Sequence, residues 1–158
     1  VGAGTSRLMD KLLDLGISDL SALDLSESAL AAARVRLSER ETSVKWIVED
    51  ITRWEPSRTY DIWHDRAVFH FLVTAKDRDA YIQRLSRSLI PGGHAIIATF
   101  ALDGPEKCSG LPVARYSPIT LAKTLGSGFS LVGHKAYLHH TPWGSRQSFQ
   151  YSLFRKLN

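Results

Sequence analysis

The sequence predicts an α/β fold in which helices cover both faces of a mostly parallel sheet and an antiparallel hairpin follows at the carboxy terminus. Two observations predict it. Through Phe100, short apolar runs alternate with helical runs, which is the pattern of parallel β-α units. Two long extended segments then follow with only a short turn between them, and a short turn joins antiparallel neighbours. We expect one domain over residues 1–158.

The chain opens on a glycine-containing loop, Val1-Gly2-Ala3-Gly4-Thr5-Ser6. Glycines allow a ligand to lie against the backbone where a Cβ would collide. Asp24 closes the next apolar run about 20 residues after Gly4, the span of a strand, a helix and the next strand. A carboxylate there can accept hydrogen bonds from two vicinal ribose hydroxyls. The loop and the acid together predict an adenosine-containing cofactor.

The first elements follow from apolar spacing and from capping residues. A helix is capped by Thr5 or Ser6 and ends at Gly16. Its apolar face is spaced i, i+4, i+7 and holds Leu8, Leu12 and Leu15. A buried strand is expected at 20–25. Ser26 then caps a second helix whose apolar positions are Leu30, Ala33 and Leu37.

Three further strands are expected at 44–48, 60–64 and 95–100. Between the last two lies a helix, stopped by Pro91-Gly92-Gly93, with one apolar face made of Tyr81, Ile82, Leu85 and Leu89.

The last third of the chain holds one more helix and the hairpin. Ser117 caps the helix, Pro118 takes its first position and Gly126 closes it. The hairpin strands are expected at 129–138 and 147–154, joined by a turn around Thr141-Pro142-Trp143-Gly144.

Composition fits a folded domain, with 44% apolar and 23% charged residues. The net charge of +4 comes from bases that alternate with acids, so nucleic acid is not expected as a partner. No apolar run approaches the roughly 20 residues that span a bilayer, and no signal peptide is recognised. The single cysteine, Cys108, cannot form an internal disulfide. We therefore expect a cytoplasmic protein that has no membrane partner.

With these features in place, the chain resembles the class I S-adenosylmethionine-dependent methyltransferases, which have a Rossmann-like fold. Five segments carry the resemblance in the family's order: Val1–Thr5, Asp24, Glu49-Asp50-Ile51, Tyr60–Leu72 and Leu89–Ile97. The third glycine of the family's first motif is Ser6 here. In the family a strand and often a covering segment precede that motif, so we expect most of the first strand to lie upstream of Val1.

The resemblance implies S-adenosylmethionine as the cofactor. The positions that it implies for cofactor binding are Gly2, Ala3, Gly4, Asp24, Leu25, Ser26, Asp50, Ile51, Asp65 and Arg66. Among them Asp24 would hold the ribose, and Asp50 with the following amide would contact the adenine.

The most unusual polar cluster is His64, Asp65, Arg66 and His70, just after a strand end, where open α/β sheets place ligands. Asp65 or His70 is the candidate general base for an acceptor that arrives protonated. The other interpretation is an Asp65–Arg66 or Asp65–His70 network that orders the loop. No spacing matches a zinc pattern, so no metal is expected. Arg115 is a candidate clamp for an anionic substrate group, and Tyr116 lies beside it.

We therefore expect methyl transfer to an acceptor for which a small molecule is favoured over a protein side chain, and the sequence predicts no oligomeric state. No Asn-Pro-Pro-Tyr-type run follows the fourth strand, so the subclasses that methylate amino groups of nucleic acids or glutamine are not expected. Two other functions stay open. One is a binding module that holds the cofactor without turnover. The other is a nicotinamide-dependent oxidoreductase, although the third glycine of G-x-G-x-x-G would then fall at Arg7.

Overall fold

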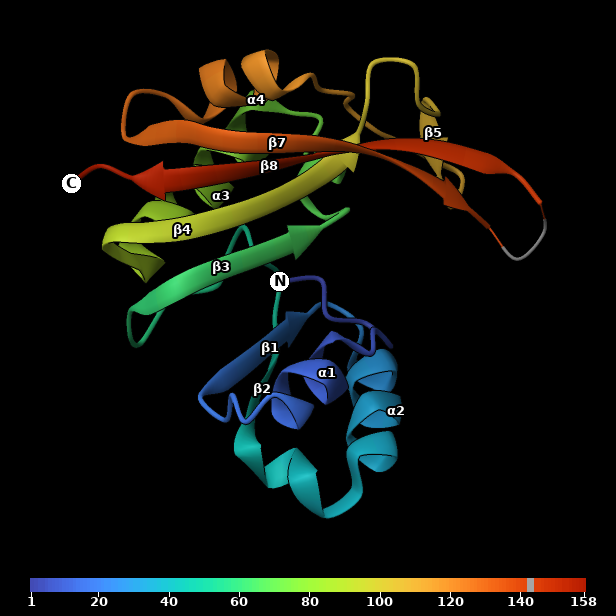
Figure 1. Cartoon of the computed structure of the whole chain (residues 1–158), viewed down its shortest axis with the longest axis vertical. Helices are drawn as coiled ribbons and strands as arrows, with labels where there is room; N and C mark the ends of the chain where they lie inside the picture. Colours follow the sequence, from blue (N-terminus) through green and yellow to red (C-terminus); the bar gives the residue numbers. More distant parts are fainter. Residues whose placement is uncertain (142–143) are drawn as a thin grey trace. The chain divides into compact units, whose positions relative to one another are not determined.

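The computed structural model describes residues 1–141 and 144–158 (Figure 1). The chain divides into two compact units, Val1–Trp54 and Glu55–Asn158, each with its own strands. The single domain expected over 1–158 therefore stays a prediction. No helix among the described residues is both long enough and apolar enough to cross a membrane.

The first unit contains two helices, a 3-10 segment and two strands: α1 (Leu8–Asp14), β1 (Leu20–Asp24), α2 (Glu27–Leu37), η1 (Ser38–Ser43) and β2 (Val44–Val48). The two strands pair in parallel, in register from Leu20↔Val44 to Asp24↔Val48 (Figure 1). Their carboxyl ends therefore meet at one edge, which is where ligands bind in open α/β sheets. The buried core of this unit is Ala22, Leu30, Leu37 and Val44.

The apolar face predicted for the first helix, Leu8, Leu12 and Leu15, is not the face that packs against the core cluster. Leu15 is 76% exposed, whereas Met9 and Leu13 pack against the core cluster. The helix ends at Asp14, so Leu15 has left the helical spiral on which the prediction depends. The cap expected from Thr5 or Ser6 is also displaced. Ser6 Oγ accepts a 3.2 Å hydrogen bond from the Leu8 amide, but the residue at the cap position makes no side-chain cap.

The second unit is built on a four-stranded sheet. Its elements are β3 (Tyr60–Arg66), η2 (Phe69–Phe71), α3 (Ala75–Ser88), β4 (Leu89–Phe100), β5 (Lys107–Cys108), β6 (Leu111–Pro112), α4 (Pro118–Leu125), β7 (Phe129–His140) and β8 (Arg146–Lys156). The sheet order is β3-β4-β8-β7, as Figure 1 shows. β3 and β4 are parallel, while β8 is antiparallel to both of its neighbours. The α/β class and the terminal hairpin are confirmed, and this sheet is mixed.

The boundary between helix and strand near residue 90 differs from the prediction. Helix α3 ends at Ser88, and β4 begins at Leu89 and runs through the Pro-Gly-Gly segment expected to be a turn. Gly93 makes this possible because a Cβ there would lie 2.9 Å from the Ile90 oxygen and 3.0 Å from the Asp61 oxygen. The register with β3 shifts across this segment, from Tyr60↔Leu89 to Ile62↔His94, so proline and glycine mark an irregularity within β4 where the two backbones approach closely.

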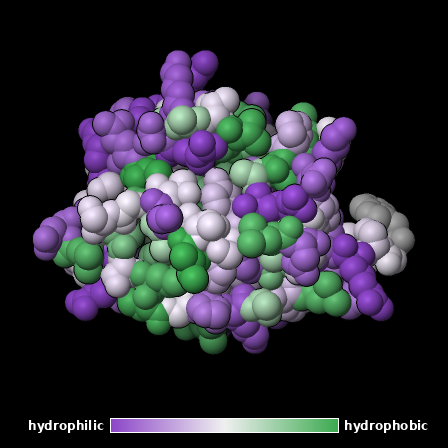
Figure 2. All heavy atoms as spheres, turned by 90° about the horizontal axis from the view of Figure 1, so that it is seen from above, coloured by the Kyte–Doolittle hydropathy of each residue, from purple (hydrophilic) through white to green (hydrophobic). Residues whose placement is uncertain are grey.

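The predicted caps and the predicted hairpin are otherwise confirmed. Ser117 and Thr120 form a reciprocal capping box on α4, and Gly126 ends that helix. The Thr141 amide donates to the Ser145 oxygen at 2.9 Å, which closes the β7–β8 hairpin. Pro142 and Trp143 of the predicted turn lie outside the described residues. Figure 2 shows hydrophobic and hydrophilic side chains intermixed over one face.

Candidate functional site

The glycine loop folds over the carboxyl end of β1. Gly2 and Gly4 have φ values of 65° and 48°, a region that favours glycine. The Gly4 amide donates to Asp24 Oδ2 at 2.8 Å, and the Ala3 amide donates to the Leu23 oxygen at 3.1 Å. The structure therefore brings the loop and the acid, which are far apart in the sequence, into direct contact.

Asp24 keeps hydrogen-bonding capacity after these contacts. Its Oδ2 accepts from Gly4, and its Oδ1 accepts from the Ser26 amide at 2.8 Å. A carboxylate offers about four lone-pair sites, so each oxygen can accept one more donor. Capping of α2 does not need Asp24, because Ser26 Oγ accepts from the Ala29 amide at 3.2 Å. Leu25, which follows the acid, is 73% exposed.

Two backbone donors of the loop are also open. The amides of Gly2 and Thr5 make no hydrogen bond to the residues that the structure describes. Open backbone N–H groups carry partial positive charge and can donate to an anionic group. The loop therefore combines free N–H donors with a carboxylate that still has free lone pairs. These two features suit a ligand that carries both a carboxylate and vicinal hydroxyls.

The loop after β2 lies beside this acid. The Glu49 amide donates to the backbone carbonyl oxygen of Asp24 at 3.1 Å, which joins the ends of β2 and β1. Asp50 Oδ1 accepts from the amide and from the hydroxyl of Thr52, both at 2.8 Å, and so orders the turn that follows. Its Oδ2 accepts nothing from the described residues. Ile51 is 5% exposed, so its side chain is buried.

The sequence analysis missed one residue that holds this loop. Arg36 of α2 donates to the carbonyl oxygens of Thr5 and Ser6 at 3.1 and 2.8 Å, and also to the carboxylate of Asp10. No local pattern connects an arginine with carbonyls about 30 residues earlier, because i, i+3 and i, i+4 spacings report only neighbours on the same helix.

In the second unit, the predicted polar cluster lies in the last three residues of β3 and in η2 after it, and Asp65 is its centre. The Asp65 carboxylate accepts from the amides of Val68 and Phe69, at 2.9 and 3.1 Å, and from the Tyr81 hydroxyl at 2.6 Å. Burial raises the pKa of Asp65, and these donors oppose that effect by favouring the charged form. Asp65 therefore orders the loop, with partners different from the Arg66 or His70 that the sequence suggested.

His70 is fully buried beside Phe71 and Phe100, whose ring centroids lie 4.6 and 4.7 Å from that of the imidazole. Burial lowers the pKa of His70 to about 4, so the ring is neutral near pH 7. Its Nδ1 accepts a long hydrogen bond of 3.4 Å from the Phe100 amide, which places the ring proton on Nε2. Nε2 has no hydrogen-bond partner among the described residues. In this tautomer Nε2 is a donor and has no free lone pair.

Arg115 and Tyr116, predicted to bind substrate, and Arg66, predicted to bind the cofactor, all lie in the second unit. Arg115 Nη2 lies 3.1 Å from Glu106 Oε1, so this guanidinium already has an anionic partner. Tyr116 is 7% exposed, and burial raises the pKa of its hydroxyl. Arg66 is exposed, and its guanidinium carbon lies 5.5 Å from the centre of the Phe149 ring.

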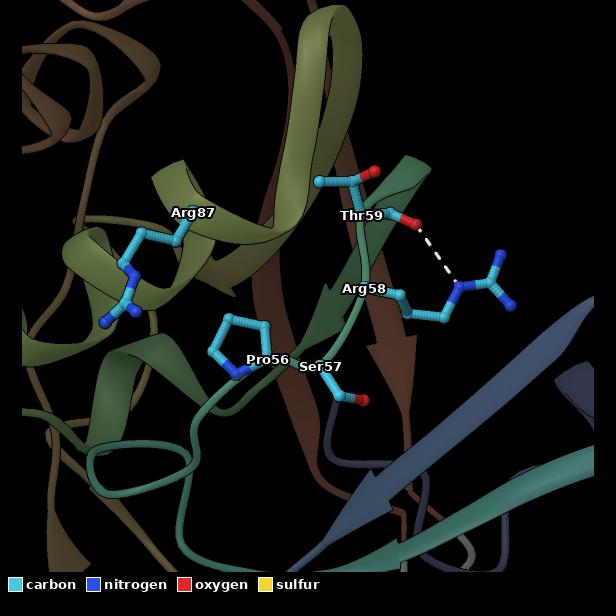
Figure 3. A pocket seen from close by; sticks show the side chains of 5 residues that line it. All are labelled: Pro56, Ser57, Arg58, Thr59 and Arg87. Carbon is cyan, nitrogen blue, oxygen red and sulfur yellow. Dashed lines mark hydrogen bonds between the residues drawn. The ribbon is translucent and has the colours of Figure 1, made fainter.

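A shallow hollow of about 500 Å³ lies elsewhere, lined by Pro56, Ser57, Arg58, Thr59 and Arg87 (Figure 3). It precedes β3 and therefore lies at the end of that strand opposite to the polar cluster. Figure 3 shows the guanidinium groups of Arg58 and Arg87 pointing away from each other. Arg87 is also paired with Glu55 at 2.8 Å. We do not regard this hollow as the site. No group of three potential metal ligands is found among the described residues.

A profile of the methyltransferase domain family matches residues 1–93, which is more than half of the sequence. The chain belongs to the methyltransferase domain family. The matched residues include the glycine loop, Asp24, Asp50 and the segment after β3. This finding confirms the predicted class I family, for which S-adenosylmethionine is the cofactor.

Individual relatives and solved structures similar to this chain are also methyltransferases. The methyltransferase domain is 28% identical over 104 residues to malonyl-[acyl-carrier protein] O-methyltransferase 2 of Ilyobacter polytropus, covering 65% of this chain and 39% of that protein. It thus spans well under half of that relative. A solved structure of a Methanosarcina mazei S-adenosylmethionine-dependent methyltransferase has a TM-score of 0.77 at 15% identity, covering 99% of this chain and 90% of the other.

A second structure is the glycopeptide N-methyltransferase MtfA complexed with S-adenosylmethionine. Its TM-score is 0.73 at 17% identity, covering 99% of this chain and 85% of that chain. Similarity at this level of identity establishes the fold of the methyltransferase domain, which is the predicted Rossmann-like class.

Proposed function

We propose that this chain binds S-adenosylmethionine through its amino-terminal loop and transfers the methyl group to a small-molecule acceptor. The observation that carries the proposal is the hydrogen bonding of the Asp24 carboxylate. Backbone amides fix both of its oxygens, and each oxygen keeps room for one more donor. The ribose hydroxyls would occupy these positions. The open amides of Gly2 and Thr5 would face the carboxylate of the methionine part.

The remaining cofactor residues support the same arrangement. Asp50 has one uncommitted oxygen in a loop that is joined to Asp24 through Glu49, which suits contact with the adenine. Ala3, Leu25, Ser26 and Ile51 would contribute backbone groups or apolar contact around these polar positions. In the second unit, Asp65 and Arg66 would shape the loop that follows β3.

When bound, S-adenosylmethionine supplies an electrophilic methyl group on a sulfonium, so the protein's task is to position the reactants. Orientation alone can lower a barrier by about 7–11 kcal/mol. The chain's own residues serve this task by fixing the loop, the acid and the ends of the strands. Asp65 contributes by holding the loop after β3 through three hydrogen bonds.

Of the two predicted catalytic residues, His70 would act as a neutral hydrogen-bond donor through Nε2, and Asp65 would act by positioning. Donation of the Phe100 amide to His70 Nδ1 argues against a lone pair at Nε2, so a base role for His70 would need the other tautomer. We therefore propose that an acceptor arrives with its nucleophilic lone pair already available.

The proposed acceptor is a small molecule. The relatives described above are named for a malonyl-[acyl-carrier protein] and for a glycopeptide, so a protein side chain stays the alternative to a small molecule. Arg115 would bind an anionic group on the acceptor by exchanging its contact with Glu106, with Tyr116 next to it in the chain.

Two titrations separate this proposal from the alternatives. Calorimetry on the full chain should show binding of S-adenosylhomocysteine and none of NADH. The reverse result would favour a nicotinamide-dependent oxidoreductase. Methyl transfer from radiolabelled S-adenosylmethionine to a panel of small molecules and peptides then tests turnover, and binding without transfer to any acceptor would indicate a non-catalytic module.

A further inference from the structure

Arg36 connects α2 with the residues that directly follow Gly4. Its Nη1 donates to the Thr5 oxygen at 3.1 Å, and its Nη2 donates to the Ser6 oxygen at 2.8 Å. The same side chain makes a two-pronged contact with Asp10, from Nε to Oδ1 at 3.1 Å and from Nη2 to Oδ2 at 3.0 Å. One guanidinium therefore makes four hydrogen bonds to the loop and to the first helix.

The surroundings of this group make it more than a surface ion pair. The side chains of Arg36 and Asp10 are 24% and 17% exposed. The hydrogen bond from Arg36 lowers the pKa of Asp10, and the same bond raises the pKa of Arg36. Partial burial weakens the solvent screening that makes most exposed pairs energetically small.

Arg36 and Asp24 hold the loop through groups of opposite polarity. The carboxylate of Asp24 accepts a hydrogen bond from the Gly4 amide, and the guanidinium of Arg36 donates to the carbonyl oxygens of Thr5 and Ser6. Because these carbonyls are bound to Arg36, the peptide planes that join Thr5 to Ser6 and Ser6 to Arg7 are held in place. The Ser6 amide lies in the first of these planes and donates to the Ala3 oxygen at 2.9 Å, so Arg36 supports the turn that contains the open Thr5 amide.

We infer that Arg36 is a positioning residue that fixes the glycine loop in the shape that binds the cofactor. The inference rests on the proposed function, because it assigns a ligand to the loop. A lysine could not replace this arginine fully, since an ammonium is a point charge without the planar fork that reaches several acceptors at fixed angles. Loss of the fork would leave the loop free to sample orientations in which its amides no longer converge.

The chain offers a matched control. Arg40 Nη1 lies 2.8 Å from Asp14 Oδ1, so Arg40→Ala also removes an ion pair to α1. Both side chains of that pair are about half exposed, and Arg40 has no hydrogen bond to the loop carbonyls. Arg36→Ala and Arg40→Ala thus each remove one arginine–aspartate pair, and only the first removes the loop contacts.

The experiment is calorimetric titration of S-adenosylhomocysteine into the full chain and into the variants Arg36→Ala, Arg36→Lys and Arg40→Ala. Arg36→Ala should weaken binding about tenfold or more, as loss of charge-assisted hydrogen bonds implies. Arg36→Lys should lie between Arg36→Ala and the unaltered chain, and Arg40→Ala should bind like the unaltered chain. Guanidinium ion added at millimolar concentration should partly restore binding to Arg36→Ala.

A second readout needs no cofactor. The amides of Gly4 and Ser6 are hydrogen-bonded to Asp24 and to the Ala3 oxygen, and their hydrogen exchange in the free chain should be faster in Arg36→Ala than in Arg40→Ala. Equal affinity and equal exchange in the two alanine variants would overturn the role of Arg36 while leaving the cofactor site intact. If the unaltered chain does not bind S-adenosylhomocysteine, the proposed function fails, and the exchange comparison still decides whether Arg36 orders the loop.

Discussion

Replacing Asp24 with asparagine should weaken the binding of S-adenosylhomocysteine about 100-fold. Both oxygens of Asp24 already accept backbone amides at 2.8 Å, and the free positions are assigned to the ribose hydroxyls. Asparagine has one acceptor oxygen and one donor nitrogen, so it can keep only part of these contacts. The side-chain nitrogen would also face either the Gly4 or the Ser26 amide, donor against donor.

The magnitude follows from the number of bonds lost. A hydrogen bond to a charged group contributes about 1.5–3 kcal/mol, whereas a neutral one contributes about 0.5–1.5 kcal/mol. Two hydroxyl contacts to the carboxylate, replaced by one neutral contact, give a loss of about 3 kcal/mol, which corresponds to the factor of about 100. The free protein should also lose stability, because one of the two backbone amides loses its acceptor.

The assay must therefore separate ribose contact from loop damage. Calorimetry with S-adenosylhomocysteine and with its 2′-deoxy analogue, on the unaltered chain and on Asp24→Asn, forms a double-mutant cycle. The unaltered chain should lose about tenfold in affinity when the hydroxyl is removed, and Asp24→Asn should lose less than about threefold. Asp14→Asn, at an exposed ion pair on the far end of α1, is the control and should behave like the unaltered chain.

The reasoning is refuted if both proteins lose the same factor on removal of the hydroxyl. Asp24 would then act on binding only through the shape of the loop, and the ribose would be held elsewhere.

Two further predictions concern stability. Burial lowers the pKa of His70 from 6.5 to about 4, so the unfolded chain binds more protons between these values and stability falls as the pH drops from about 6.5 towards 4. The contribution lost is about 3 kcal/mol, and urea unfolding of His70→Phe should be less dependent on pH in this window than that of the unaltered chain; equal dependence would contradict the assignment. Gly93→Ala should destabilise the chain by about 2 kcal/mol or more, because the new Cβ would lie 2.9 Å from the Ile90 oxygen. Gly128→Ala, where no atom lies within 4 Å of a new Cβ, is its control, and an equal cost for the two would show that Gly93 is not needed for strand approach.

Sequence patterns predicted the features that depend on local chemistry. The caps at Ser26 and Ser117 and the paired strands of the terminal hairpin follow from residue types at fixed offsets, and the structure contains them. That the glycine loop and Asp24 would serve one cofactor site was expected from the β-α-β span, but the direct hydrogen bond between the Gly4 amide and Asp24 was not predicted.

The predictions that were wrong concern features that depend on tertiary contacts. The Pro-Gly-Gly segment was expected to turn the chain, but β4 runs through it, and the register with β3 shifts there from Tyr60↔Leu89 to Ile62↔His94. The exposed Leu15 reflects a helix that ends one residue earlier than its apolar spacing suggests. Arg36 could not have been found from the sequence, because its partners lie about 30 residues away and are backbone carbonyls that every residue has.

The most direct test of the central claim is the map of amide chemical shifts of the full chain as S-adenosylhomocysteine is added. Ordered amides at Gly4, Thr5, Asp24 and Ser26 should shift most, with further changes around Asp50. Shifts confined to the hollow at residues 56–59, or no shifts at saturating ligand, would contradict the assignment of the cofactor to the amino-terminal loop.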